Sequence, residues 1–234
     1  MNFVYAATLK KRFTCYGHFY LWQPVLQDQT FPCRSLLEIV DSTIEVERLS
    51  ESKPDCVVIM MNPGSSHPFD ASYIPETIEF PEKPFIAHTS LTPTQPDNTQ
   101  YQIMRIALVK NWHHVRVLNL SDLRDPKSVS FMQRVEVLAE TMGGTMHSLF
   151  CEERTLERNH LLSRAAGAPI LLGWGQARGL LPLARRCMEE LKKEKTYTVL
   201  SAVDPLLNAH PSPMMQSKKE LWLKQMLDAL DDVR

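Results

Sequence analysis

An amide and an imidazole, each in a loop that follows an apolar run, are the side chains of this chain best placed for chemistry. Asn62 opens the loop after residues 57–61, and His210 begins a loop that comes after residues 197–200. Apolar, β-branched runs of this length are typical of buried parallel strands, and chemistry in open α/β sheets gathers at the carboxyl ends of strands. We therefore expect both side chains to face one cleft, which suits cleavage of a bond whose leaving group departs as an anion.

Two further predicted strands also end in distinctive residues. The second ends at Asn119, and the third ends in Gly173-Trp174-Gly175. Asn119 has the donor and acceptor needed to read the amide edge of a pyrimidine, whereas Asn62 can hold a water or a carbonyl but is no strong base. Gly175, ahead of a predicted helix, permits close packing or the approach of a phosphate. The four strand ends share one edge if the sheet is parallel.

The loops beside Asn62 and His210 predict substrate and DNA contacts. The substrate group comprises Pro63, Gly64 and Ser65, which form a tight turn in which glycine lets a ligand approach the backbone. The DNA group comprises Ser212 and Lys218 for phosphates and Met214 and Met215 as an apolar wedge between bases. Each motif also has an ordinary structural interpretation as a turn, a proline-stiffened loop or core packing.

Length and composition indicate one globular domain spanning residues 1–234. The chain is 44% hydrophobic and 23% charged, and its net charge of −1 neither indicates nor excludes nucleic-acid binding. It has no apolar run near the roughly 20 residues that span a bilayer, and residues 1–12 do not resemble a signal peptide. We expect a cytoplasmic monomer with no membrane partner.

The five cysteines are odd in number and include no Cys-x-x-Cys pair. This pattern argues against a disulfide framework and against a zinc or iron–sulfur site. We expect reduced thiols, no metal and no cofactor.

The hydrophobic pattern predicts strands that alternate with helices, which implies a mainly parallel sheet. Central strands are predicted at 55–61, 115–120, 169–172 and 196–203, and helices at 35–49, 98–110, 130–142, 152–166, 176–195 and 217–230. Residues 1–22 predict strands at a sheet edge, and residues 62–98 a long irregular stretch with seven prolines. The expected fold is a three-layer α/β/α sandwich. Its central four-stranded sheet lies in a motif-bearing core at 55–220, and residues 1–54 supply edge strands and a helix.

The motifs resemble those of the uracil-DNA glycosylase superfamily. Met-Asn-Pro-Gly at 61–64 resembles its first motif, and His-Pro-Ser-Pro at 210–213 matches its second. Leu118-Asn119 is similar to the strand asparagine that reads the base, and residues 171–175 to the apolar strand that ends in Trp-Gly. The resemblance covers about residues 55–220 and implies a uracil-DNA-glycosylase-like fold with Asn62 and His210 as catalytic residues.

A closer resemblance is to the domain-of-unknown-function family numbered 1643. That family joins Leu-Trp, Met-Asn-Pro, Asn-Leu, Arg-Asp-Pro and Trp-Gly, here at 21–22, 61–63, 119–120, 124–126 and 174–175. Phage-restricting glycosylases that excise hypermodified cytosines are linked to proteins of this kind. The resemblance therefore implies a defence enzyme at least as readily as a repair enzyme.

The chain also departs from the uracil pattern. Asn62 stands where the main uracil branch has aspartate, Met214 stands where leucine is usual, and the 65–98 loop has no counterpart in a compact uracil pocket. These departures favour a pocket for an enlarged base, such as glucosylated hydroxymethylcytosine of phage DNA.

The expected reaction is hydrolysis of the bond between a base and deoxyribose, which leaves an abasic site without lyase chemistry. His210 would stabilise the departing base and Asn62 would position the water, with Asp70 or Asp204 as candidates for a base. Three alternatives stay open. They are a uracil or mismatch repair glycosylase, an enzyme of free nucleosides or nucleotides, and a non-catalytic nucleic-acid sensor.

Overall fold

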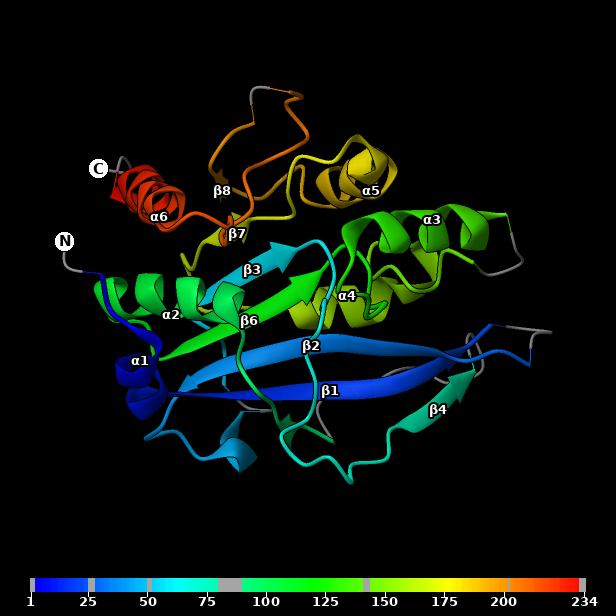
Figure 1. The fold of residues 1–234 in the computed structure, drawn as a ribbon, viewed down its shortest axis with the longest axis horizontal. Helices are drawn as coiled ribbons and strands as arrows, with labels where there is room; N and C mark the ends of the chain where they lie inside the picture. The colour runs from blue at the N-terminus through cyan, green and yellow to red at the C-terminus, as the bar shows by residue number, and fades with distance from the viewer. Residues whose placement is uncertain are drawn as a thin grey trace.

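The computed structural model describes residues 3–24, 28–49, 52–79, 90–140, 144–201 and 203–231. The elements follow one another as α1 (Ala6–Arg12), β1 (Phe13–Gln23), β2 (Phe31–Asp41), η1 (Val46–Arg48), β3 (Cys56–Met60), β4 (Glu76–Glu79), β5 (Thr92–Pro93), α2 (Asn98–Lys110), β6 (His114–Asn119), α3 (Ser128–Ala139), η2 (Glu152–Arg154), α4 (Thr155–Leu162), β7 (Ile170–Leu172), η3 (Arg178–Leu180), α5 (Leu181–Glu190), β8 (Thr196–Thr198) and α6 (Gln216–Asp231). From α2 onward, helical segments alternate with strands, as the hydrophobic pattern predicts (Figure 1).

The strands form one sheet in the order β4-β1-β2-β6-β3-β7-β8, with β5 paired to β1. The four strands β6, β3, β7 and β8 are parallel, whereas β2 joins β6 in antiparallel register. The prediction of an α/β fold with a mostly parallel central sheet is confirmed. The predicted strand number is wrong, because the sheet of the described residues has eight strands rather than four.

Of the four additional strands, β1 falls almost entirely in residues 1–22, which predict strands, whereas β2, β4 and β5 come from segments that the sequence pattern assigns differently. Residues 35–49 predict a helix, yet residues 31–41 form β2, which pairs with β1 on one side and β6 on the other. Because β2 is buried on both faces, apolar residues follow one another at 36, 37, 39 and 40, and this spacing imitates a helical stripe. The β1–β2 hairpin therefore lies inside the sheet and not at its edge, with β4 and β5 beyond it.

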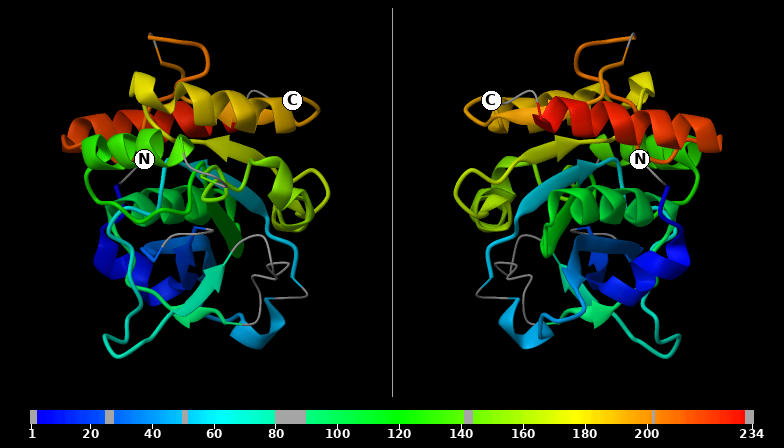
Figure 2. Two further views of the ribbon diagram at one scale, coloured as in Figure 1. Left: turned by 90° about the vertical axis from the view of Figure 1, so that its right-hand side faces the viewer. Right: turned by 90° about the vertical axis from the view of Figure 1, so that its left-hand side faces the viewer.

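Helices cover both faces of the sheet and make three layers (Figures 1 and 2). Val58 and Met60 of β3 pack in the core formed with α1, α2 and α6. Val57 and Ile59, which alternate with them, pack in the core formed with α3, α4 and α5. The predicted sandwich thus holds at the level of its layers.

Other predicted elements differ from the structure mainly in length. Helix α2 begins where expected, after an Asp97 capping box. The fourth central strand stops at Thr198, and the 152–166 and 176–195 segments each open with a 3₁₀ turn before a shorter helix. The predicted irregular stretch at 62–98 contributes β4 and β5, and its residues 80–89 lie outside the described residues.

The His210 loop is seated against the end of β7 by a glycine. A Cβ added to Gly173 would lie 2.9 Å from Pro211 Cγ and 3.1 Å from Met60 Sδ. From the other side, the buried Gln102 of α2 donates through Nε2 to the Pro211 carbonyl at 3.0 Å. The loop is therefore fixed between the end of β7 and α2.

We expect Gly173→Ala to lower the free energy of unfolding by about 1–3 kcal/mol, because the methyl group overpacks this contact. Urea unfolding measures the loss. Gly167→Ala is the control, since its added methyl group meets no atom within 4 Å and only its positive φ of 76° is strained. Equal stability of Gly173→Ala and the native protein would contradict the close packing described above.

Candidate functional site

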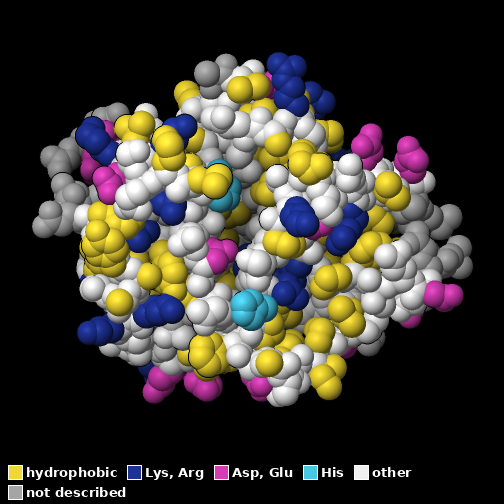
Figure 3. All heavy atoms as spheres, viewed as in Figure 1, with side chains coloured by type: hydrophobic (Ala, Val, Ile, Leu, Met, Phe, Trp, Pro, Cys, Tyr) yellow, Lys and Arg dark blue, Asp and Glu magenta, His cyan; other side chains and the backbone are white. Residues whose placement is uncertain are grey.

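A cavity of about 210 Å³ opens at the carboxyl ends of β3 and β6. It is lined by Met60–Ser65 after β3, by Val117 and Asn119 of β6, by Asp125-Pro126, by Asp97, Thr99, Gln100 and Ile103 at the start of α2, by His210, and by Arg34 of β2. Figure 3 shows the face that is viewed in Figure 1, which is hollowed near its middle. Acidic, basic and histidine side chains gather around this hollow.

The structure brings part of the predicted site together. Asn62, Pro63, Gly64, Ser65, Asn119 and His210 all line the cavity. Gly175, Ser212, Met214, Met215 and Lys218 do not line it. Asn62, Asn119 and His210, which follow the first, second and fourth predicted strands, therefore share one cavity. Gly175, which follows the third predicted strand, lies outside it.

The turn after β3 holds the next loop in place. The Pro63 carbonyl accepts from the Ser66 amide at 3.1 Å, and Gly64 adopts a φ of +60° that favours glycine. Asn62 donates through Nδ2 to the carbonyls of Asp125 at 2.8 Å and Leu123 at 3.2 Å. Within the described residues its Oδ1 accepts no hydrogen bond, so this oxygen can hold a water.

Asn119 links three strands at the wall of the cavity. Its side chain is fully buried, and the amide orientation that satisfies both ends donates to the Asn62 carbonyl at 3.2 Å. In that orientation Oδ1 accepts from Arg34 Nη2 at 3.3 Å. Since an amide has a second N–H and a second lone pair, Asn119 can still contact a ligand.

His210 is held as a neutral donor. The Ser212 amide donates to His210 Nδ1 at 3.1 Å, so the ring proton of the neutral form lies on Nε2. Burial lowers the pKa of His210 below 6.5, although the carboxylate of Asp97 opposes this shift. The ring can therefore donate a hydrogen bond from Nε2 at neutral pH.

Two carboxylates line the cavity that sequence reasoning did not assign to it. Asp125 is committed to structure, because its oxygens accept from the Lys127 amide at 2.9 Å and from Ser130 Oγ at 2.7 Å. Asp97 Oδ1 accepts from the Thr99 and Gln100 amides, as an N-cap does. Among the described residues no group donates to its Oδ2, so Asp97 has an open carboxylate oxygen.

The two carboxylates considered as bases from the sequence lie elsewhere. Asp70 accepts from the Ser72 amide and hydroxyl, and Asp204 accepts from the Leu206 amide. Neither lines the cavity. Asp97, which the sequence indicated only as a helix cap, is therefore the better candidate.

Gly175 serves a structural role in this arrangement. Its φ is +107°, and its amide donates to Asn208 Oδ1 at 3.2 Å while its carbonyl accepts from the Asn208 amide. The neighbouring Trp174 is buried and donates through Nε1 to the Leu206 carbonyl. These contacts fix the start of the segment that leads to His210.

The predicted DNA-contacting residues follow His210 directly at the surface. Met214 is 99% exposed, Met215 and Lys218 are also exposed, and Ser212 is half-buried. Two apolar side chains in water beside a cavity are consistent with a contact surface, and their role in binding DNA stays a prediction.

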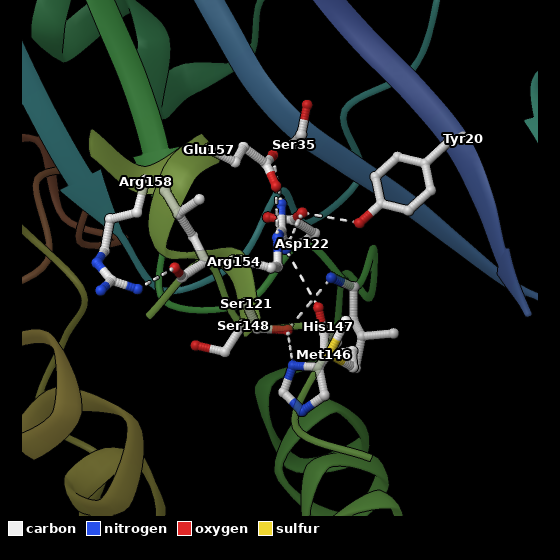
Figure 4. Close-up of polar contacts among 12 residues, drawn as sticks. Tyr20, Ser35, Ser121, Asp122, Met146, His147, Ser148, Arg154, Glu157 and Arg158 are labelled. Carbon is white, nitrogen blue, oxygen red and sulfur yellow. Dashed lines mark hydrogen bonds and ion pairs between the residues drawn. The ribbon is translucent and has the colours of Figure 1, made fainter. Parts of the chain in front are cut away.

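A buried polar network lies beyond the cavity, on the face of the sheet that α3, α4 and α5 cover (Figure 4). Arg154 contacts Asp122 Oδ2 at 2.7 Å and binds Glu157 through two nitrogens at 2.7 and 2.8 Å. Tyr20 donates to Asp122 Oδ2 at 2.8 Å, and burial raises the pKa of Asp122 to about 6. The network fixes the loop after β6 that Asn62 holds from the other side.

The buried His147 in this region is expected to make the stability of the fold fall at acidic pH. Burial lowers its pKa to about 3, whereas an unfolded histidine titrates near 6.5. Below pH 6.5 the unfolded chain binds a proton that the folded chain does not, so the free energy of unfolding falls as the pH falls, by about 2 kcal/mol at pH 5. We expect the free energy of unfolding of His147→Asn, measured by urea unfolding at pH 7, 6 and 5, to lack this part of the fall with pH. A pH dependence identical to that of the native protein would exclude His147 as its source.

Comparison with models of known protein families, with curated proteins and with solved structures finds no match to this chain. The resemblance to glycosylases therefore rests on the motifs alone. All five cysteines are buried and unpaired with one another. Within the described ranges no three His, Cys, Asp or Glu side chains gather as they would for a metal ion. None of the helices in those ranges has the length and apolar character to span a membrane.

Proposed function

We propose that this protein is a monofunctional DNA glycosylase that hydrolyses the N-glycosidic bond of a base and leaves an abasic site. The observation that carries the proposal is the convergence of Asn62, Asn119 and His210 on one cavity, with the His210 proton on Nε2. An acceptor for a water, an amide for a base edge and a neutral donor for a leaving group are the groups that this reaction needs.

In the proposed reaction a water oxygen bonds to C1′ as the bond from C1′ to the base nitrogen breaks. The bonding electrons leave with the base, and the sugar passes through an oxocarbenium-like transition state. His210 donates from Nε2 to the negative charge that develops on the base. Asn62 Oδ1 accepts from the water, and the open oxygen of Asp97 takes a proton from it.

The cavity size favours a base with one ring. An apolar cavity of about 150 Å³ accommodates a benzene ring, so about 210 Å³ admits a pyrimidine with room for small groups. We propose a modified cytosine of phage DNA, such as glucosylated hydroxymethylcytosine, in antiviral defence. The pyrimidine ring would lie in the cavity, and the glucose attached to the base would lie outside it, beside the exposed Ser65.

The flipped nucleotide leaves a gap in the base stack that a partner side chain must fill. In this proposal Met214 and Met215 fill the gap, while Ser212 and Lys218 bind phosphates on either side. The protein would act as a monomer in the cytoplasm. Its local contacts, rather than its net charge of −1, would supply DNA affinity.

A comparison of substrates separates this proposal from its alternatives. We expect base release from an oligonucleotide and none from the matching free deoxynucleoside, with DNA affinity that falls as salt rises. Faster release from the nucleoside would instead favour an enzyme of free nucleosides. Tight binding of the oligonucleotide without release would favour a sensor.

A further inference from the structure

Arg34 lies at the cavity with most of its hydrogen-bonding capacity unused. Its side chain is 1% exposed, and Nη2 donates to Asn119 Oδ1 at 3.3 Å. In the described part of the chain Nε and Nη1 have no partner, and no carboxylate lies within ion-pair distance of the guanidinium. A buried cation without a partner is costly, so its position needs a reason other than stability.

The other buried arginines of the described residues have partners for their charge or for their N–H groups. Arg116 binds Glu38 at 2.7 Å, Arg154 binds Asp122 and Glu157, and Arg158 binds Glu190 at 2.8 Å. Arg105, which has no carboxylate either, donates to two oxygens at 2.7 Å and packs on a Phe3 ring. Arg34 has neither arrangement.

A local irregularity of β2 directs Arg34 to the cavity. Phe19 pairs with Arg34 while His18 pairs with Leu36, so the register shifts by one residue between them. As a result, Cys33 and Leu36 pack in the same core, on the face of the sheet opposite the cavity. Without the shift, side chains would alternate strictly along β2, and Arg34 would point into that core together with Leu36. The shift turns Arg34 to the cavity face instead. Shifts of this kind re-aim side chains beside active sites.

Charged neighbours of both signs act on the Arg34 guanidinium. Asp97, on the cavity wall, favours the charged form of Arg34 without forming an ion pair with it, and Arg124 lies near enough to disfavour it. Burial is the largest effect and lowers the pKa of Arg34 to about 10, so the guanidinium stays charged at neutral pH. Its field acts on whatever enters the cavity.

We propose that Arg34 recognises a carbonyl oxygen of the ligand and stabilises the negative charge that builds on the base as it leaves. The inference rests on the proposed function and narrows it to bases with a carbonyl beside the glycosidic nitrogen, which is the pyrimidine class. Asn119 fixes the guanidinium, His210 donates from another side of the cavity, and the bond cleavage is the one described above. No further reactant is needed.

The test combines stability, ligand binding and base release in the native protein, Arg34→Met and Arg34→Lys. Free cytosine is the probe, and 4-aminopyrimidine, which is cytosine without the carbonyl at C2, is its control. We expect Arg34→Met to raise Tm by about 2–4 °C, because an unpaired buried cation is removed. Cytosine should raise the Tm of the native protein but not that of Arg34→Met, and 4-aminopyrimidine should raise the Tm of neither.

Base release gives the second arm. Single-turnover release by Arg34→Met should fall about 10²-fold with unchanged DNA affinity, and Arg34→Lys, which keeps the charge, should recover part of it. A lower Tm of Arg34→Met with an unchanged cytosine shift would overturn the inference, as would release at the native rate. If the native protein released no base but lost its cytosine shift on Arg34→Met, the proposed function would fail while the binding role of Arg34 stood.

Discussion

Replacing His210 by alanine should lower single-turnover base release about 10²–10³-fold. The reason is the loss of a preorganised donor, since removal of one such group from a site that stabilises developing negative charge has an effect of this size. His210 is well suited to this role because the Ser212 amide fixes its tautomer and burial keeps it neutral. Quench-flow with detection of the free base measures the rate.

The control for this variant is His160→Ala, which removes an exposed histidine of α4. It should release base at the native rate. We expect His210→Ala to keep its DNA affinity and its Tm, because the ring makes only one hydrogen bond within the described residues. Native release rates in His210→Ala would remove His210 from the reaction.

The largest expected loss of stability follows from Arg154→Met. The variant leaves Asp122 and Glu157 buried without their cation, and breaking a buried ion pair in this way costs about 3–5 kcal/mol. The Asp122 segment also carries the loop to which Asn62 donates, so base release should fall together with stability. Urea unfolding followed by far-UV circular dichroism measures the free energy of unfolding.

Arg48→Met provides the matched comparison. Arg48 pairs with Glu45, both side chains are more than 70% exposed, and a pair at the surface is worth no more than about 1 kcal/mol. The two variants remove the same group from a buried ion pair and from an exposed ion pair. Equal losses in both would contradict the structural importance assigned to the buried network.

The parallel half of the fold could be predicted from sequence because each of its strands is short, apolar and bounded by turns. Residues 56–60 are buried on both faces, and α2 carries an Asp97 cap that is visible in the sequence. The β1–β2 half could not be predicted in the same way. In β2 the succession of buried residues on both faces hides the strand period, and tertiary pairing with β1 and β6 decides the conformation.

The same distinction holds for the site. Asn62, Asn119 and His210 follow apolar runs, so the rule that strand ends converge identifies them. Arg34 lies in β2 just before residues 35–49, for which the sequence predicts a helix, and only the register shift in the hairpin turns it to the cavity. The sequence shows that Asp97 caps α2. Its proposed second role, as the carboxylate that takes a proton from the water, depends on where α2 packs, which no local pattern specifies.

The most direct test of the central claim is mass-spectrometric detection of free base and abasic site from DNA that carries uracil, hydroxymethylcytosine or glucosylated hydroxymethylcytosine. The native protein should release a pyrimidine base together with an equal amount of abasic site, and His210→Ala should release far less. Release of the glucosylated base alone would establish the modified-cytosine specificity proposed here, and release of uracil would indicate repair. Failure to release any base, from a folded protein that binds these DNAs, would contradict the glycosylase account.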